Sequence, residues 1–207
     1  MTRAPFSVEV DTALVHIVRP VAVAVEPVAV SRGAPWLDQP LADAAERLRA
    51  GDVPAHVTAA VRSLYKRIGI DPTKTRPSSE ALVRRVRKGD GLPRVNSLVD
   101  VINWCSAETQ LPYGLYDRHH IDGAVQMRLG HAGESYPGIR KDEVHVGGRL
   151  VLADAIGAFG NPTSDSLRTA VTEVTTAAVV VIFAPAELPH ELAASAMQLT
   201  LERLESM

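Results

Sequence analysis

Apolar residues recur every three or four positions between residues 76 and 117 and predict two helices there. The first is expected over residues 79–88, because Ser78 and Ser79 offer an N-cap and Gly89 can end the helix. Three residues form its apolar face: Ala81, Leu82 and Val86. The rest of its surface is basic, so this helix should turn a basic face to water or to a polyanion.

The second helix is expected to begin at Asn96 or Ser97, after a chain break at residues 91–93. Its apolar positions recur at helical spacing: Leu98, Val99, Ile102 and Cys105. It should be largely buried, although Asp100 and Asn103 lie within the same pattern. Because a buried carboxylate or amide needs hydrogen-bond partners, each of the two is either a structural hydrogen-bonding group or part of a pocket.

The first 70 residues combine a little β structure with further helices. Clusters of β-branched residues within residues 6–30 indicate two or three strands. A short amphipathic helix is expected over residues 41–50, ended by Gly51, and the apolar stripe of a longer one covers residues 57–68.

After residue 121 the pattern changes to short apolar segments separated by glycine turns, which is typical of an antiparallel sheet. Residues 177–183 are apolar throughout, which indicates a central strand covered on both faces. An amphipathic segment over residues 189–205 predicts a closing helix. Three further strands are expected within residues 124–129, 143–146 and 149–154.

These elements predict an α/β (α+β) fold, a single domain with a mixed, mostly antiparallel sheet flanked by helices. The chain has 207 residues and 46% hydrophobic content, which is enough for one sizeable core. Residues 1–75 are expected to supply strands and helices integral to that domain. Residues 76–207 are expected to form its core together with the closing C-terminal helix.

Charge is distributed unevenly along this chain. The formal net charge is -2, but residues 62–94 hold ten basic and three acidic residues, or +7, which leaves -9 for the remainder. Such a segment can bind phosphates on an otherwise acidic body, or it can be a solvated helix face. Its densest part consists of four residues: Arg84, Arg85, Arg87 and Lys88.

Several classes of protein are excluded or disfavoured. Cys105 is the only cysteine, so the chain has neither an internal disulfide nor a thiolate metal cluster, and a cytoplasmic location is expected. The apolar run over residues 21–30 is far shorter than the roughly 20 residues of a membrane span, so no membrane association is expected. His119 and His120 are adjacent and point in different directions, and no common catalytic or nucleotide-binding motif is present. We therefore expect no metal and no cofactor.

A dense polar loop over residues 159–166 follows one of the buried segments, and loops of this kind often line sites. More polar residues come directly after it: Arg168, Thr169, Thr172, Glu173 and Thr175. The alternative is a capped turn, in which Asn161 and Pro162 start the turn and residues 163–166 satisfy backbone groups.

A set of spaced residues resembles the editing domain of the phenylalanyl-tRNA synthetase beta chain, the B-three/B-four domain. The similarity covers roughly residues 76–185, and the runs over 76–82 and 160–166 are similar to those of free-standing bacterial relatives. It implies an α/β domain that hydrolyses tyrosine wrongly esterified to the phenylalanine tRNA. The residues that carry it are Leu92-Pro93, Asn96, Val99-Asp100, Asn103, the run 111–117, Ile121-Asp122-Gly123, Arg128, Gly133-Glu134 and the run 151–154.

The resemblance also has departures. The synthetase pattern carries a histidine where this chain has Gly114, and a substrate-reading glutamate on the strand that corresponds to residues 177–183, where no carboxylate is present. Asn103 matches a family asparagine, but the pocket-lining threonine before it is replaced by Ile102. The resemblance therefore implies a more apolar pocket that prefers a different amino acid.

Two functions follow as hypotheses. The first is a trans-acting editing hydrolase that deacylates a misacylated tRNA, and the alternative is a non-catalytic module that binds a tRNA end, an aminoacyl-adenosine or an amino acid. Aminoacylated tRNA is the expected partner and DNA is not, while the oligomeric state is left open. The catalytic candidates are Asn103, Asp117, Glu134, His145 and Glu173. The substrate-binding candidates are Tyr113, Gly114, Asn161, Ser164, Arg168 and Thr172, and the tRNA-binding candidates are Arg84, Arg85, Arg87 and Lys88.

Overall fold

The computed structural model describes residues 1–51, 53–139 and 141–206. Its central element is an antiparallel sheet, here called sheet A, with the strand order β1-β3-β10-β4. The four strands are β1 (Thr2–Pro5), β3 (Val18–Glu26), β10 (Ala178–Pro185) and β4 (Tyr113–Asp117). All residues of β10 are buried, and β10 lies between β3 and β4. The predicted central strand is confirmed.

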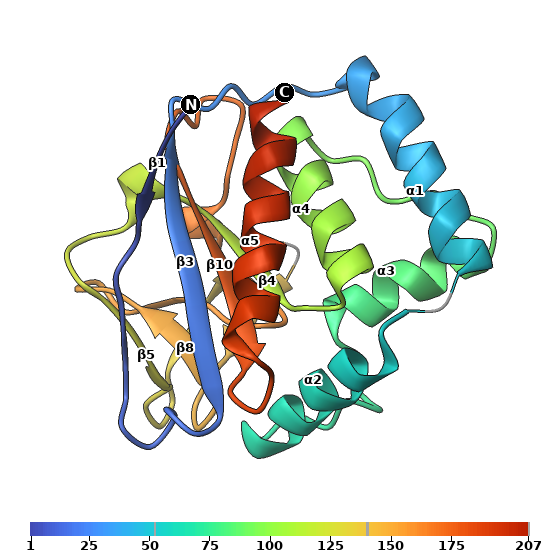
Figure 1. Cartoon of the computed structure of the whole chain (residues 1–207). Helices are drawn as coiled ribbons and strands as arrows, with labels where there is room; N and C mark the ends of the chain where they lie inside the picture. Colours follow the sequence, from blue (N-terminus) through green and yellow to red (C-terminus); the bar gives the residue numbers. More distant parts are fainter. Residues whose placement is uncertain (52, 140, 207) are drawn as a thin grey trace.

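A second sheet, sheet B, covers the face of sheet A on the left in Figure 1. Its order is β2-β5-β8-β9, in which the β2–β5 pair is parallel and the β5–β8 and β8–β9 pairs are antiparallel. The sheets are therefore mixed and mostly antiparallel, as predicted. The strands are β2 (Val8–Val10), β5 (Val125–Leu129), β8 (Leu150–Ala153) and β9 (Ala158–Gly160), and β6 (Ser135–Gly138) and β7 (Lys141–His145) form a separate hairpin.

Helices form the layer on the opposite side of sheet A, on the right in Figure 1. They are α1 (Asp38–Ala50), α2 (Ala55–Arg67), α3 (Ser78–Arg87), α4 (Ser97–Thr109) and α5 (His190–Glu205). The described residues also form three short 3-10 helices: η1 (Pro35–Leu37), η2 (Arg118–His120) and η3 (Leu167–Thr169). The two sheets and the helical layer make a single α/β domain. No helix among the described residues is long and apolar enough to cross a membrane.

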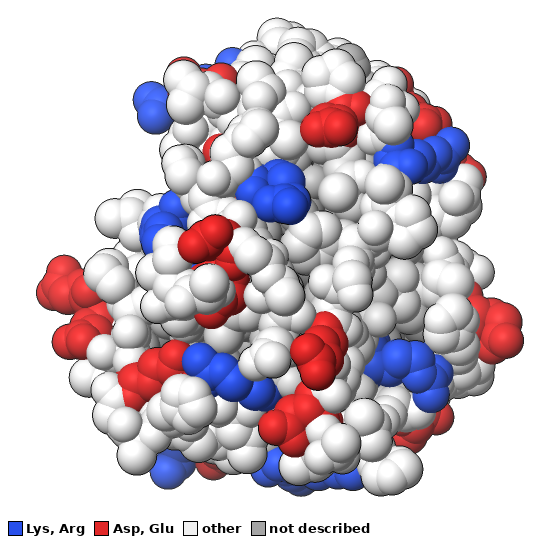
Figure 2. All heavy atoms as spheres, turned by 90° about the vertical axis from the view of Figure 1, so that its left-hand side faces the viewer, with Lys and Arg blue, Asp and Glu red and all other residues white. Residues whose placement is uncertain are grey.

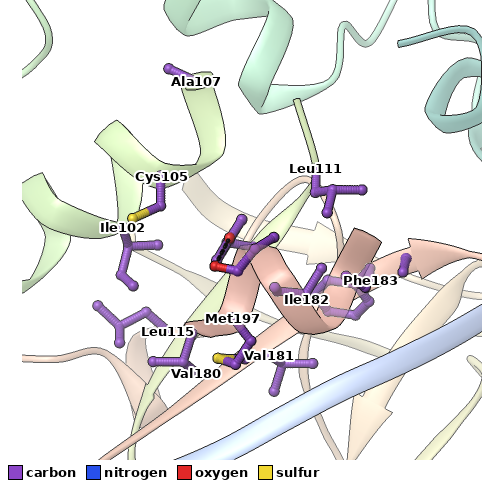
Figure 3. Packing of buried hydrophobic residues seen from close by; sticks show 14 of the residues in the cluster. Ile102, Cys105, Ala107, Leu111, Leu115, Val180, Val181, Ile182, Phe183 and Met197 are labelled. Carbon is purple, nitrogen blue, oxygen red and sulfur yellow. Dashed lines mark hydrogen bonds between the residues drawn. The ribbon is translucent and has the colours of Figure 1, made fainter. Parts of the chain in front are cut away.

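The packing of α4 and α5 against sheet A forms the main core. Figure 3 shows Ile102 and Cys105 of α4 near Leu115 of β4, Val180 of β10 and Met197 of α5. All five residues are buried. This apolar contact fixes β4 between the helices on one face and sheet B on the other.

The ends of the two predicted helices differ in how they are capped. Asn96 caps α4 as expected, because its side chain accepts a hydrogen bond from the Val99 backbone N–H at 2.9 Å. Asp100 is structural: its carboxylate accepts from Arg94 Nε at 2.8 Å and from the Val95 N–H at 2.7 Å.

The side-chain capping expected for α3 was wrong, and its expected apolar face was correct for Val86 and Leu82 but not for Ala81. Ser79 donates its hydroxyl to the Gln110 carbonyl instead of capping the helix, and Pro77 is the N-cap residue. The buried face of α3 consists of Ser79, Val83 and Val86, whereas Ala81 is exposed. The helix packs mainly on α4, so the position of α4 and not the local apolar pattern selects the buried face.

The N-terminal strands are part of both sheets, since β3 pairs with every residue of β10 in sheet A and β2 pairs with β5 in sheet B. A boundary near residue 75 within this domain stays a prediction.

Candidate active site

Strand β4 directs alternate side chains to opposite faces of sheet A. Tyr113 points to the helices, where its hydroxyl hydrogen-bonds with Thr200 Oγ1 at 3.1 Å and with the Ala196 carbonyl at 3.3 Å. Gly114 and Tyr116 lie on the other face, toward sheet B. Tyr113 is therefore separated by the sheet from the polar loop with which it was grouped.

The space beside Gly114 is filled by the ring of Tyr116. A Cβ atom built on Gly114 would overlap the Tyr116 hydroxyl and lie 2.7 Å from its ring carbons. A Cβ on Gly160 of β9 would meet the same ring from the other side, at 2.6 and 2.7 Å. Tyr116 is completely buried, with its ring edge-to-face on Phe159 at 5.0 Å between centroids. Gly114 is thus one wall of a filled slot, and not the floor of an open pocket.

The loop over residues 161–166 is a capped turn, as the second interpretation of the sequence expected. Asn161 Oδ1 accepts from the backbone N–H groups of Thr163 at 2.8 Å and Ser164 at 2.9 Å, and from the Thr163 hydroxyl at 2.7 Å. Asn161 Nδ2 donates to the Tyr136 hydroxyl at 2.9 Å. The turn is therefore tied to the core through the Asn161 amide.

Three tyrosines from three different elements hold this loop, and we call them the tyrosine cluster. Tyr65 of α2 donates its hydroxyl to the Pro162 carbonyl at 2.7 Å, and Tyr136 of β6 donates to the Ser164 carbonyl at 2.6 Å. Tyr116 donates to Asp165 Oδ1 at 2.9 Å. Burial raises the pKa of all three phenols, so they act as hydrogen-bond donors at neutral pH.

Asp165 is the titratable group at the centre of this arrangement. Burial raises the pKa of its carboxyl to about 7, against the opposing effect of the Tyr116 hydrogen bond. Among the residues that the structure describes, Tyr116 is the only hydrogen-bond donor to this carboxyl. Sequence reasoning passed over Asp165, although it lies in the loop that was singled out. Its one available signal was that it is the only carboxylate there.

Two sequence candidates are thus brought together with β4. Asn161 and Ser164 lie in the turn that carries Asp165, and Asp165 is joined through Tyr116 to the strand of Gly114. Asn103 lies half-buried on α4, on the helical side of sheet A, and is not part of this group.

The other carboxylate candidates are occupied elsewhere. Glu134 forms a two-point ion pair with Arg128, with both N–O distances 2.8 Å, which helps lower the pKa of Glu134 to about 2. Asp117 accepts from the His119 N–H at 3.0 Å and from the Thr175 hydroxyl at 2.6 Å. Both carboxylates thus support local backbone structure.

The remaining candidates lie at the surface or support other segments. His145 is exposed at the end of β7, and Glu173 is exposed and ion-paired with Arg32. The Thr172 N–H donates to Thr175 Oγ1 at 3.0 Å, which places it beside Asp117. Arg168 forms a two-point ion pair with buried Asp154, with both distances 2.9 Å. Asp154 in turn stays ionised, because this pairing helps to lower its pKa.

The basic residues of α3 are of two kinds. Arg87 donates to the carbonyls of Leu48 at 3.4 Å and Gly51 at 3.0 Å, at the C-terminus of α1, and Arg85 donates to the Gly91 carbonyl at 3.0 Å. Arg84 and Lys88 are exposed and have no partner in the described part of the chain. On a different face, the one turned to the viewer in Figure 2, acidic and basic side chains are interspersed. Within the described ranges, no group of three His, Cys, Asp or Glu side chains could hold a metal ion.

Comparisons with known proteins place the chain in a family. A solved structure, an N-terminal fragment of the phenylalanyl-tRNA synthetase beta-subunit from Pyrococcus horikoshii, is similar with a TM-score of 0.48 and 14% sequence identity. That match covers 98% of this chain and 51% of the fragment, so the chain spans about half the length of that fragment. A search of curated proteins gives no match. The sequence profile of the B3/4 domain matches residues 60–202, which is most of the chain, and the chain therefore belongs to the B3/4 domain family.

Proposed function

We propose that this protein is an aminoacyl-tRNA deacylase, which cleaves the ester between a wrongly attached amino acid and the terminal adenosine of a tRNA. Two observations support a role connected with tRNA. The chain belongs to the B3/4 domain family, and its spaced residues resemble the editing domain of the phenylalanyl-tRNA synthetase beta chain. Because Gly114 replaces the synthetase histidine, the attacking water needs a different base.

Asp165 is the observation that carries the proposal. A carboxyl whose pKa is about 7 is partly ionised at neutral pH and can still take a proton from water, which is the property a general base needs. The Tyr116 hydroxyl that donates to Asp165 lies beside Gly114, the position that matches the synthetase histidine. One carboxyl oxygen accepts from Tyr116, and no described residue donates to the second, which can receive the proton of an attacking water.

The surrounding residues would fix the base. The tyrosine cluster holds both the carbonyls of the turn and Asp165 itself, so the carboxyl keeps one orientation. An aminoacyl ester is already activated, so positioning a water beside a base, with polar donors for the developing oxyanion, is sufficient chemistry. No covalent nucleophile is required.

A non-catalytic binding module is the second candidate, and the filled slot favours it. The Tyr116 ring takes the space beside Gly114, and β10 offers no carboxylate to read a substrate. A protein of this kind would bind the aminoacylated end of a tRNA without hydrolysing it.

A deacylation panel separates the two functions. The purified chain is incubated with tRNAs misacylated with small, branched and aromatic amino acids, and the rate of amino-acid release is compared with buffer. We expect release from at least one of them, and a rate lower by about 100-fold or more for Asp165→Asn. Asp90→Asn, at an exposed position, is the matched control. If no tRNA is deacylated while misacylated tRNA binds more tightly than uncharged tRNA, the protein is the binding module.

A further inference from the structure

A hollow of about 500 Å³ opens on sheet A beside strands β1 and β3. It lies between the paired strands β1 and β3 on one side and η2 on the other. The lining residues used below are Thr2, Ala4, Ala24, Glu26, Arg118 and His119.

Strand register places a cation and an anion on opposite sides of this hollow. Ala178 of β10 pairs with Val25 on one side and with Asp117 on the other, and the Arg118 N–H donates to the Ala177 carbonyl. Arg118 and Glu26 therefore lie in one row, two strands apart. At about 4.8 Å per strand, their Cα atoms are separated by roughly 10 Å. Directly opposed residues share a face, so both lie on the face that carries Tyr116.

The side chains of Thr2, Ala4 and Ala24 on the sheet surface of the hollow are small. Ala4 of β1 is paired with Ala24 of β3, and Thr2 is paired with Glu26. The two alanine methyl groups leave this part of the sheet open, and they offer an apolar surface next to the charged row.

Neither of the two charged groups forms an ion pair with another side chain that the structure describes. The Arg118 guanidinium stacks over the Phe6 ring at 5.4 Å, and its Nη1 donates to the Ile121 carbonyl at 3.2 Å, so the group is held in place. Its other N–H groups have no partner among the described residues, and neither does the Glu26 carboxylate. His119 lies next to Arg118, and its Nε2 hydrogen-bonds with Thr176 Oγ1 at 3.3 Å.

We infer that this hollow binds a free zwitterionic α-amino acid. Its carboxylate is bound by Arg118, its ammonium group by Glu26, and its side chain lies on the alanines. Glu26 disfavours a simple anion such as phosphate, because a second negative charge would face it. An amine alone is disfavoured by Arg118 for the same reason. The inference stands on the charges of the hollow, independently of the deacylase proposal.

Calorimetric titration of the full chain with amino acids tests this assignment. A panel of small, branched and aromatic α-amino acids is compared with two sets of blocked analogues, the N-acetyl amino acids and the methyl esters. We expect the zwitterions to bind best, and removal of either charge to weaken binding by about tenfold or more, because each charge-assisted hydrogen bond is lost.

Two variants assign the charges to their partners. Arg118→Gln should weaken binding of the zwitterion by at least about tenfold and leave binding of the methyl ester unchanged. Glu26→Gln should weaken binding of the zwitterion and leave binding of the N-acetyl compound unchanged. Glu26 has no partner in the described chain, so Glu26→Gln is expected to fold normally. Arg149→Gln and Glu187→Gln, at exposed positions, are the matched controls.

Three outcomes overturn the inference. These are binding of inorganic phosphate but of no amino acid, amino-acid binding that Glu26→Gln does not change, and no binding of any zwitterion. The deacylation panel tests the proposed activity independently of these outcomes. Deacylation without amino-acid binding refutes only this site, and amino-acid binding without deacylation refutes only the proposed activity.

Discussion

Asp165 should give the stability of the protein an unusual pH dependence. Its folded pKa of about 7 lies above the ordinary value of about 4, so the folded state holds this proton longer than the unfolded state does. The stabilising contribution is complete below about pH 4 and is lost as the pH rises through 7. We expect the free energy of unfolding to fall by a few kcal/mol over this range, as about 1.4 kcal/mol accompanies each pKa unit.

Urea unfolding between pH 4 and pH 8 measures this dependence. The Asp165→Asn variant should lose most of the slope, while Asp90→Asn should keep it. Glu134 acts in the opposite direction, because its pKa is lowered to about 2 and its contribution is lost only in acid. A wild-type slope retained in full by Asp165→Asn would mean that the carboxyl does not titrate near 7.

The slot around Tyr116 makes Gly114 intolerant of any side chain. Gly114→Ala should destabilise the domain by about 1–3 kcal/mol, because its methyl group overlaps the phenol ring. Gly91→Ala, where a methyl group meets nothing within 4 Å, should cost much less. Chemical denaturation of Gly114→Ala in the wild-type and Tyr116→Ala backgrounds measures the coupling between the two positions. Equal costs of Gly114→Ala in the two backgrounds would show that the ring does not occupy this space.

Only part of this slot could be predicted from the sequence. Alternation along β4 places Gly114 and Tyr116 on one face, which the sequence pattern could indicate. Gly160, on the other side of the ring, is 44 positions from Tyr116 in the sequence and contacts the ring through the packing of the two sheets. The burial of Asp165 has the same origin, since its neighbours come from α2, β4 and β6.

Helix α3 carries the charges that we assign to tRNA. Reversing the two cations that have no partner in the described chain, as in Arg84→Glu with Lys88→Glu, should weaken tRNA binding and flatten the slope of log affinity against log salt by about one to two units. Filter binding at several salt concentrations measures this slope. Unchanged affinity and slope would return this helix face to the second interpretation of the sequence, a solvated surface.

Arg87 calls for a separate variant, because it supports the C-terminus of α1. Arg87→Gln should lower the melting temperature and leave the salt slope of the folded protein nearly unchanged. Arg149→Glu, an exposed arginine in a turn, is the control for charge reversal alone.

The elements themselves were largely predictable from local patterns. Helices α3 and α4 begin within one residue of their predicted starts, and the apolar run over residues 177–183 became the central strand β10. Strand partners were not predictable. The parallel pairing of β2 with β5 joins segments more than 110 residues apart, and no local signal encodes such a contact.

At the scale of the whole molecule, sheet A separates two environments. Its helical face buries an apolar core, and its other face meets sheet B, where the tyrosine cluster surrounds Asp165. Tyr113 and Asn103 matched the family sequence but lie on the helical side. The site we propose therefore uses one face of β4 and the loop after β9.

The central claim is that Asp165 acts as the general base of a deacylase. The most direct measurement is the single-turnover rate of amino-acid release between pH 5 and pH 9, corrected for release in buffer, with the best tRNA of the panel. We predict a wild-type rate that rises to a plateau with an inflection near pH 7, and an Asp165→Asn rate at least about 100-fold lower without that inflection. Identical rates and pH profiles for the two proteins would contradict the account.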